Sequence, residues 1–236
     1  MWRAQLSGLS DIATVVAVDL RGRGKSPAEA GRWSIDDHAD DLAETLRALG
    51  ADRADVAGFS MGGYVVLALQ RRYPQLVRRL VLIDTRATAD GPRIREGRAR
   101  TAALIGQEGV AALLPKVLPR LVAPGAAEDL RRSVETMFRD TPASTGIADT
   151  LAMSERPDST SGLAAIEAPV LVANGEWDAT ISVDQAKQMA AEIPDAVFVV
   201  VPGAGHLTPM ENPAAINEAL RAFLKAPPGT AAERRD

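Results

Sequence analysis

Short apolar runs and helical patterns alternate along most of this sequence, and that alternation limits the folds open to it. Predicted strands cover residues 13–19, 54–59, 79–84, 169–174 and 196–201, and predicted helices cover residues 34–49, 61–72, 183–191 and 212–224. The strand segments are continuous Val, Leu, Ile and Ala runs, which are typical of parallel strands buried on both faces. The sequence therefore predicts an α/β fold with a mostly parallel sheet flanked by helices.

The alternation stops between residues 87 and 165, where only helical stretches occur. They cover residues 94–105, 110–121, 128–138 and 145–152, with Pro and Gly between them. One crossover between parallel strands normally needs a single helix, so several helices favour an inserted helical cap over a long crossover. We expect a core formed by residues 1–86 and 166–226, a helical cap at residues 87–165 and a frayed tail at residues 227–236.

Composition and charge exclude several classes of partner. The net charge is -4, so the chain has no broad basic field for nucleic acid or an anionic membrane. The chain has no cysteine, which excludes disulfides, thiolate metal sites and a Cys nucleophile. No apolar run approaches the roughly 20 residues of a membrane span, and the first residues do not resemble a signal peptide. We expect a cytoplasmic protein that binds a small molecule and has no metal or cofactor site.

A serine stands on a predicted strand-to-helix turn, in the sequence Gly58-Phe59-Ser60-Met61-Gly62. A residue on so sharp a turn takes a strained backbone conformation, and we expect Gly58 and Gly62 to leave room that side chains would fill. The N–H of Met61, at the start of the helix, is suited to stabilise an oxyanion. Ser60 is therefore the predicted nucleophile, and Met61 is the predicted oxyanion donor.

A serine hydroxyl needs a base to take its proton, and the chain has only two histidines, His38 and His206. His206 follows a predicted strand, at the edge where the ends of parallel strands gather ligands, so it is the predicted base. His38 lies inside a predicted helix among aspartates. A solvated or helix-capping role fits it better.

Three carboxylates are candidates for the acid that orients His206. Asp178 follows the strand at residues 169–174 and produces the chain order Ser, Asp, His, so it is the first choice. Glu176 is a near rival on the same loop. Asp84, at the end of the strand at residues 79–84, is the second rival, because an adjacent strand end could also reach His206.

These motifs together resemble the α/β-hydrolase superfamily. Residues 58–63 are similar to its nucleophile elbow, residues 19–26 to the turn after its fourth strand, and residues 175–178 and 203–206 to its acid and base loops. Residues 153–160 are similar to a segment of 3-oxoadipate enol-lactonase-like and small carboxylesterase members. The resemblance implies a serine esterase or lactonase that acts on small carboxylic esters or lactones through an acyl-enzyme. We expect Met137, Phe138 and Met153 of the cap to line an apolar acyl pocket.

The start of the chain departs from that family pattern. Residues 1–6 resemble the helix that follows the loop supplying the second oxyanion N–H, and a strand inside the family's sheet order is missing. Either the strand at residues 13–19 pairs beside residues 54–59, or a second copy fills the gap in a homodimer, or the chain is a fragment. Losing one oxyanion donor typically costs about 10²- to 10³-fold in turnover. The alternatives to an esterase are therefore a weakly active or silent ligand-binding homologue, and a perhydrolase or haloperoxidase-type enzyme that uses peroxide in place of water.

Overall fold

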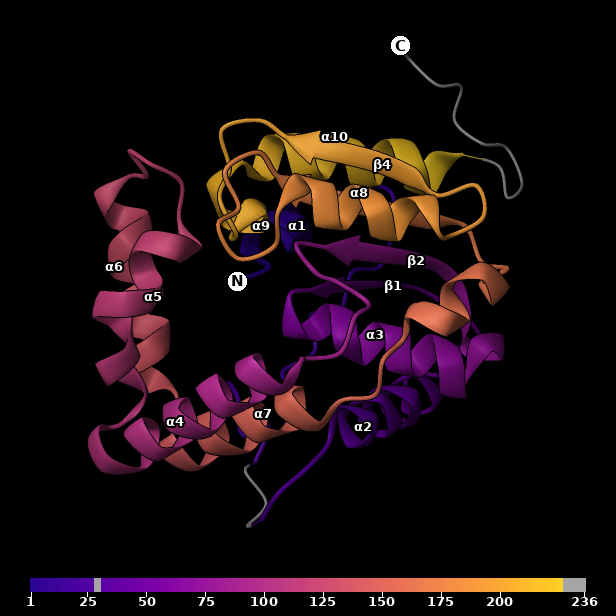
Figure 1. The fold of residues 1–236 in the computed structure, drawn as a ribbon. Coiled ribbons are helices and arrows are strands. Elements are labelled where there is room, and N and C mark those ends of the chain that lie inside the picture. Colours follow the sequence, from indigo (N-terminus) through magenta and orange to yellow (C-terminus); the bar gives the residue numbers. More distant parts are fainter. Residues whose placement is uncertain (28–30, 227–236) are drawn as a thin grey trace.

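The sheet is parallel, as the sequence predicts. The computed structural model describes residues 1–27 and 31–226 (Figure 1), so the predicted frayed tail lies outside the described residues. Within this part of the chain, four parallel strands pair in the order β1 (Ala54–Phe59), β2 (Val77–Ile83), β3 (Val170–Gly175) and β4 (Val197–Val201). The two central strands, β2 and β3, are the most buried. The α/β fold class is confirmed.

Helices cover both faces of the sheet because successive side chains of a strand point to opposite faces. Leu80 and Leu82 of β2 pack in one cluster with α2 (Ile35–Ala48), α3 (Met61–Arg72) and α8 (Val183–Ala191). Val81 and Ile83 pack in a second cluster with α10 (Pro213–Lys225) and with Leu9, which directly follows α1 (Arg3–Gly8). Each of the predicted helices 34–49, 61–72, 183–191 and 212–224 is present within one residue of its expected bounds.

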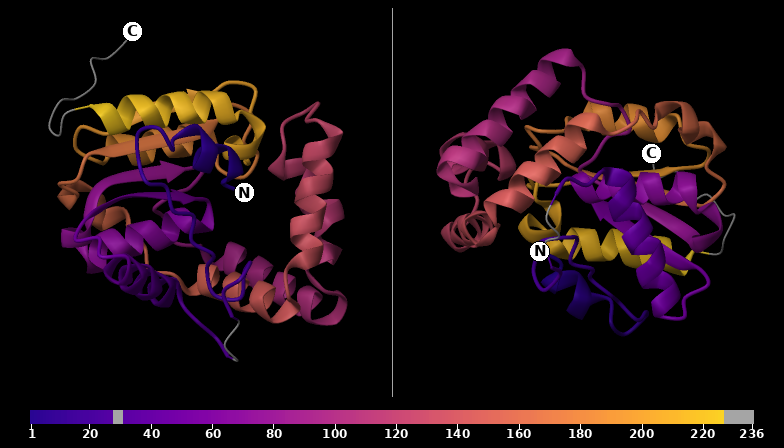
Figure 2. Two further views of the ribbon diagram at one scale, coloured as in Figure 1. Left: turned by 180° about the vertical axis from the view of Figure 1, so that it is seen from behind. Right: turned by 90° about the horizontal axis from the view of Figure 1, so that it is seen from below.

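The segment between β2 and β3 folds into further helices. They are α4 (Pro92–Glu108), α5 (Leu114–Leu121), α6 (Glu128–Asp140) and α7 (Ala143–Glu155), with a 3-10 turn at Val110–Leu113 before α5. We call this segment the helical insertion. The helices α4 and α7 pack on each other, whereas α5 and α6 stand beyond the carboxyl ends of the strands (Figures 1 and 2). Across residues 1–27 and 31–226, no helix has the length and apolar character needed to cross a membrane.

Residues 13–19 do not form the predicted strand. Val16 and Val18 are 54% and 38% exposed, and among the described residues β1 pairs with β2 alone. A β-rich run becomes a strand only where a neighbouring backbone supplies hydrogen bonds, and here side-chain packing of Val15 on the second cluster holds the segment instead. The explanation in which this segment pairs beside β1 is therefore wrong.

His38 is fully buried, so the expectation of a solvated or capping residue is also wrong. Its Nε2 lies 3.4 Å from Oδ1 of Asp149 in α7, and that carboxylate also accepts hydrogen bonds from Trp33 Nε1 and Arg23 Nη2 at 2.9 and 2.6 Å. Burial alone would raise the pKa of Asp149. The His38 hydrogen bond and the Arg23 charge lower it by more than burial raises it, so the pKa of Asp149 lies below its ordinary value. The cluster joins the helical insertion to the core.

Candidate active site

Ser60 stands on the sharp turn between β1 and α3. Its φ and ψ are 50° and -113°, a region that costs a non-glycine residue of the order of 1 to 3 kcal/mol and persists only where the surroundings hold it. Ile83, the last residue of β2, and Thr85, just past its end, hold this conformation. The Ser60 N–H donates to Ile83 O at 2.9 Å, and Thr85 Oγ1 donates to Ser60 O at 2.8 Å. Met61 is the first residue of α3. Its N–H is therefore one of the N–H groups in the first turn, which have no acceptor within the helix.

The glycines around Ser60 differ in the space that they have. A Cβ on Gly58 would lie 2.2 Å from Gly62 O, and one on Gly63 would lie 2.3 Å from Thr85 Oγ1. A Cβ on Gly62 would meet nothing within 4 Å. The expectation that both flanking glycines provide needed space is therefore right for Gly58 and wrong for Gly62. Gly63, which packs against β2, has the second tight position.

Replacing Gly58 with alanine is expected to lower the free energy of unfolding by about 1 to 3 kcal/mol, because the backbone carbonyl of Gly62 cannot move aside cheaply. Gly62→Ala is the matched control. It is expected to leave stability within about 1 kcal/mol of the wild type, since alanine favours a helix over glycine by about that amount. Urea unfolding of the three proteins measures both differences. Equal midpoints for Gly58→Ala and Gly62→Ala would contradict the expectation.

Two loops at the carboxyl ends of β3 and β4 bring Asp178 and His206 to Ser60. We call residues 175–182 the acid loop and residues 202–208 the base loop. His206 Nε2 lies 2.9 Å from Ser60 Oγ, and His206 Nδ1 lies 2.8 Å from Asp178 Oδ2. Both side chains are buried. The other oxygen of Asp178 accepts hydrogen bonds from the N–H groups of Thr180 and Ile181 at 2.7 and 3.0 Å, so the carboxylate is held from both sides.

The two rival carboxylates hydrogen-bond to groups near His206 other than the imidazole. Glu176 Oε2 accepts the N–H of Gly203 at 2.8 Å. Asp84 Oδ1 accepts the N–H of Gly175 at 2.8 Å, and its Oδ2 accepts a hydrogen bond from Thr208 Oγ1 at 2.6 Å. Burial raises the pKa of Asp84 well above its ordinary value, and these hydrogen bonds only partly oppose the shift. Of the three candidates, Asp178 is the one placed to orient His206.

Glu211 is a site residue that the sequence analysis did not identify. It ends α9 (Thr208–Glu211), and its Oε1 accepts the N–H groups of Gly205 and Leu207 at 3.0 and 2.9 Å, on either side of His206. Its Oε2 accepts the N–H of Ala123, just past α5, at 2.6 Å. The N–H of His206 donates to Leu121 O at 3.0 Å. The base loop is thus tied to the helical insertion. Pro209 at the start of α9 is the signal that could have predicted this helix.

Apolar side chains connect Ser60 and His206 to α5 and α6. Phe59 and Leu207, the chain neighbours of the two residues, belong to one cluster with Met137, Phe138 and other residues of α5 and α6. The Phe59 ring lies 5.2 Å from the His206 ring, measured between centroids. Met153 instead packs against the main core cluster, and Arg98 Nη1 lies 3.4 Å from its sulfur.

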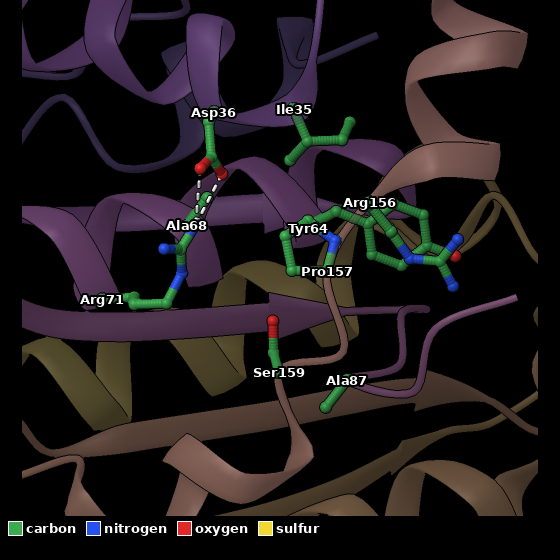
Figure 3. Close-up of a pocket in the computed structure, with 9 residues that line it drawn as sticks. All are labelled: Ile35, Asp36, Tyr64, Ala68, Arg71, Ala87, Arg156, Pro157 and Ser159. Atoms are coloured by element: carbon green, nitrogen blue, oxygen red, sulfur yellow. Dashed lines mark hydrogen bonds and ion pairs between the residues drawn. The ribbon is translucent and has the colours of Figure 1, made fainter.

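Two cavities lie apart from Ser60, Asp178 and His206. The smaller, of about 10 Å³, opens between α2, α3 and residues 156–159, where the Arg156 guanidinium lies 4.0 Å from the centroid of the Tyr64 ring (Figure 3). The larger, of about 380 Å³, is lined by residues of α5 and α6 and of the turn before α5, including Leu114, Leu118 and Arg131. Ser60, Asp178 and His206 line neither cavity.

Comparison with known proteins agrees with the fold. The family described as alpha/beta hydrolase fold matches residues 1–213. A putative carbamate hydrolase RutD of Azorhizobium caulinodans is 30% identical, over 94% of this chain and 85% of its own. A thermophilic esterase from Thermogutta terrifontis has a TM-score of 0.93 at 37% identity, over 95% and 84% of the two chains. The enol-lactonase from Burkholderia xenovorans has a TM-score of 0.86 at 27% identity, over 95% and 86%. The chain belongs to the α/β-hydrolase fold family.

Proposed function

We propose that this hydrolase cleaves small carboxylic esters or lactones through an acyl-enzyme formed on Ser60. The observation that carries the proposal is the continuous chain of hydrogen bonds from Ser60 Oγ through both ring nitrogens of His206 to Asp178, with distances of 2.9 and 2.8 Å. The relatives support the reaction class. Their names include an esterase, an enol-lactonase and a putative carbamate hydrolase, and each such reaction attacks a carbonyl that carries a heteroatom leaving group.

Ser60, His206, Asp178 and the N–H of Met61 each take part in this mechanism. His206 Nε2 takes the proton of Ser60 Oγ as that oxygen attacks the substrate carbonyl. The N–H of Met61 donates to the oxyanion at the start of α3, where the helix dipole adds to the stabilisation. Asp178 holds the imidazole in the tautomer that keeps Nε2 free to accept, and it stabilises the imidazolium that forms. The proton then passes to the leaving oxygen. Water attacks the acyl-enzyme with His206 again as the base.

The helical insertion acts in this proposal as a cap over the reacting groups. The helices α5 and α6 stand beyond the carboxyl ends of the strands (Figure 1). Their apolar residues pack in one cluster with Phe59 and Leu207. Met137 and Phe138 form part of the acyl wall. Met153, which packs on the core, belongs to this wall at the base of the insertion. Such a wall favours a short apolar acyl group and excludes water from it.

A fluorophosphonate probe tests the nucleophile directly. The wild type is expected to gain one probe adduct, located on Ser60 by peptide mass spectrometry, because this electrophile reacts with a serine that a base activates. Ser60→Ala is the control and is expected to remain unlabelled. An unlabelled wild type, or equal labelling of both proteins, would contradict the proposal.

The reaction class is tested with short-chain aryl esters and lactones, each incubated with and without peroxide. Alcohol release or ring opening in water alone supports the hydrolase. Product that requires peroxide would support the perhydrolase or haloperoxidase alternative. Saturable binding, with all ligand recovered intact, would support a silent binding protein.

A further inference from the structure

The carboxyl end of β2 contacts all three loops that carry the proposed catalytic residues. Ile83 O and Thr85 Oγ1 bind the backbone of Ser60. Asp84, between them, binds the other two loops, with Gly175 N–H of the acid loop on Oδ1 and Thr208 Oγ1 of the base loop on Oδ2. Three consecutive residues therefore fix the relative positions of three separate loops.

Asp84 is held firmly in this place. Asp84 is 0% exposed. Its φ of 48° lies in the left-handed region, which asparagine and aspartate tolerate better than most residues. Its backbone N–H continues the sheet by donating to Ala173 O at 2.9 Å. The Thr208 N–H lies 3.4 Å from Oδ2, so the end of the base loop reaches the carboxyl group through both backbone and side chain. The site therefore has the rigidity that a fixed connection between loops needs.

The connection lies close to the reacting groups. Gly175 O accepts the N–H of Asp178 at 3.2 Å, and Thr208 is two residues beyond His206. The two loops touch directly, since a Cβ on Gly175 would lie 1.9 Å from Gly205 O. A shift of either loop relative to the other would change the separation of Asp178 and His206.

We propose that Asp84 is a positioning residue whose carboxyl group joins the acid loop to the base loop and so keeps Asp178 and His206 aligned with Ser60. This inference rests on the proposed function. The carboxyl group of Asp84 hydrogen-bonds to Gly175 and Thr208 rather than to Ser60 Oγ or the imidazole, so it acts through these two residues.

The connection consists of hydrogen bonds, and a neutral side chain of the same shape can also form two of them. Burial raises the pKa of Asp84 well above its ordinary value, and the charge of nearby Asp178 raises it further. The carboxyl group accepts the Gly175 N–H on Oδ1 and the Thr208 hydroxyl on Oδ2. Asparagine has nearly the same shape, and it also tolerates the left-handed backbone. Its oxygen can accept the Gly175 N–H, and its NH₂ group can donate to Thr208 Oγ1.

The test compares Asp84→Gly with Asp84→Asn. Glycine suits the backbone angle and removes the carboxyl group, so we expect kcat for aryl-ester hydrolysis to fall about 10- to 100-fold with KM nearly unchanged, as for a small misplacement of reacting groups. Asp84→Asn is expected to recover kcat to within about threefold of the wild type. A role in stability alone would lower the unfolding midpoint and leave kcat of the folded enzyme unchanged.

A second pair of variants keeps the proposal testable if Asp84→Gly does not fold. Thr208→Val preserves the side-chain shape and removes the hydroxyl, and it is expected to lower kcat about tenfold. Thr208→Ser keeps the hydroxyl and is its matched control, with kcat expected near that of the wild type.

The outcomes separate this inference from the proposed function. A wild type that fluorophosphonate labels on Ser60, together with unchanged kcat in folded Asp84→Gly or in Thr208→Val, overturns the positioning role alone. Loss of kcat in Asp84→Asn equal to that in Asp84→Gly also overturns it, because hydrogen bonding would then not be the basis. A wild type that the probe does not label overturns the proposed function and this inference with it.

Discussion

Ser60→Ala is expected to lower kcat for p-nitrophenyl acetate hydrolysis by about 10⁶-fold, the size of loss seen when a triad serine is removed. The variant keeps His206 and Asp178 at their 2.8 Å contact but removes the oxygen that Nε2 activates. No acyl-enzyme can form, so one direct attack of water on the ester replaces acylation and deacylation. Initial rates at saturating substrate, extended over hours for the variant, measure the effect.

A change in folding must be separated from this loss. The hydroxyl of Ser60 hydrogen-bonds to His206 Nε2, and the backbone bonds to Ile83 and Thr85 do not involve it. The urea midpoint of Ser60→Ala is therefore expected to stay close to that of the wild type. A folded variant that keeps more than a tenth of wild-type kcat would rule out Ser60 as the nucleophile.

Asp178→Asn is expected to lower kcat by about 10⁴-fold, because it changes the tautomer of His206. The asparagine oxygen would stay on the N–H groups of Thr180 and Ile181, as Oδ1 of Asp178 does now. Its NH₂ group would then face Nδ1, which must accept, so the ring proton moves to Nε2. An Nε2 that carries a proton cannot take one from Ser60. The same ester assay across pH measures the loss and any partial recovery at high pH.

Glu176→Gln is the matched control for that substitution. Glu176 lies two residues earlier on the same loop, and its Oε2 accepts only a backbone N–H, that of Gly203, which an amide oxygen can replace. Its kcat is expected to remain within about threefold of the wild type. A loss as large in Glu176→Gln as in Asp178→Asn would mean that the acid loop as a whole, and not the Asp178 carboxylate, supports His206.

Local patterns were enough to predict most of the elements and the hydrogen-bonded group. The strand at residues 54–59, the helix at residues 61–72 and the helix at residues 183–191 have the bounds that the sequence predicts. Ser60, Asp178 and His206 could be identified because each lies just beyond a strand of strong apolar character. Parallel strands bring such positions together at one edge, whatever the chain between them does.

The rest depended on contacts that no local pattern contains. Residues 13–19 have the composition of a strand, but a strand also needs a partner at its edge. The tight positions at Gly58 and Gly63 depend on where Gly62 O and Thr85 lie, so the spacing of glycines around Ser60 did not separate them from Gly62. His38 stands among aspartates in the sequence, and such neighbours suggest a position exposed to solvent. Its side chain instead contacts Asp149, more than a hundred residues away.

The hydrogen bonds between the base loop and the end of α5 couple the positions of these two segments. If α5 swung outward to admit a substrate, the bonds from His206 N–H to Leu121 O and from Ala123 N–H to Glu211 would stretch or break. The backbone of His206 would then lose its hydrogen bond to Leu121. The position of the end of α5 and the position of the base loop are therefore not independent of each other.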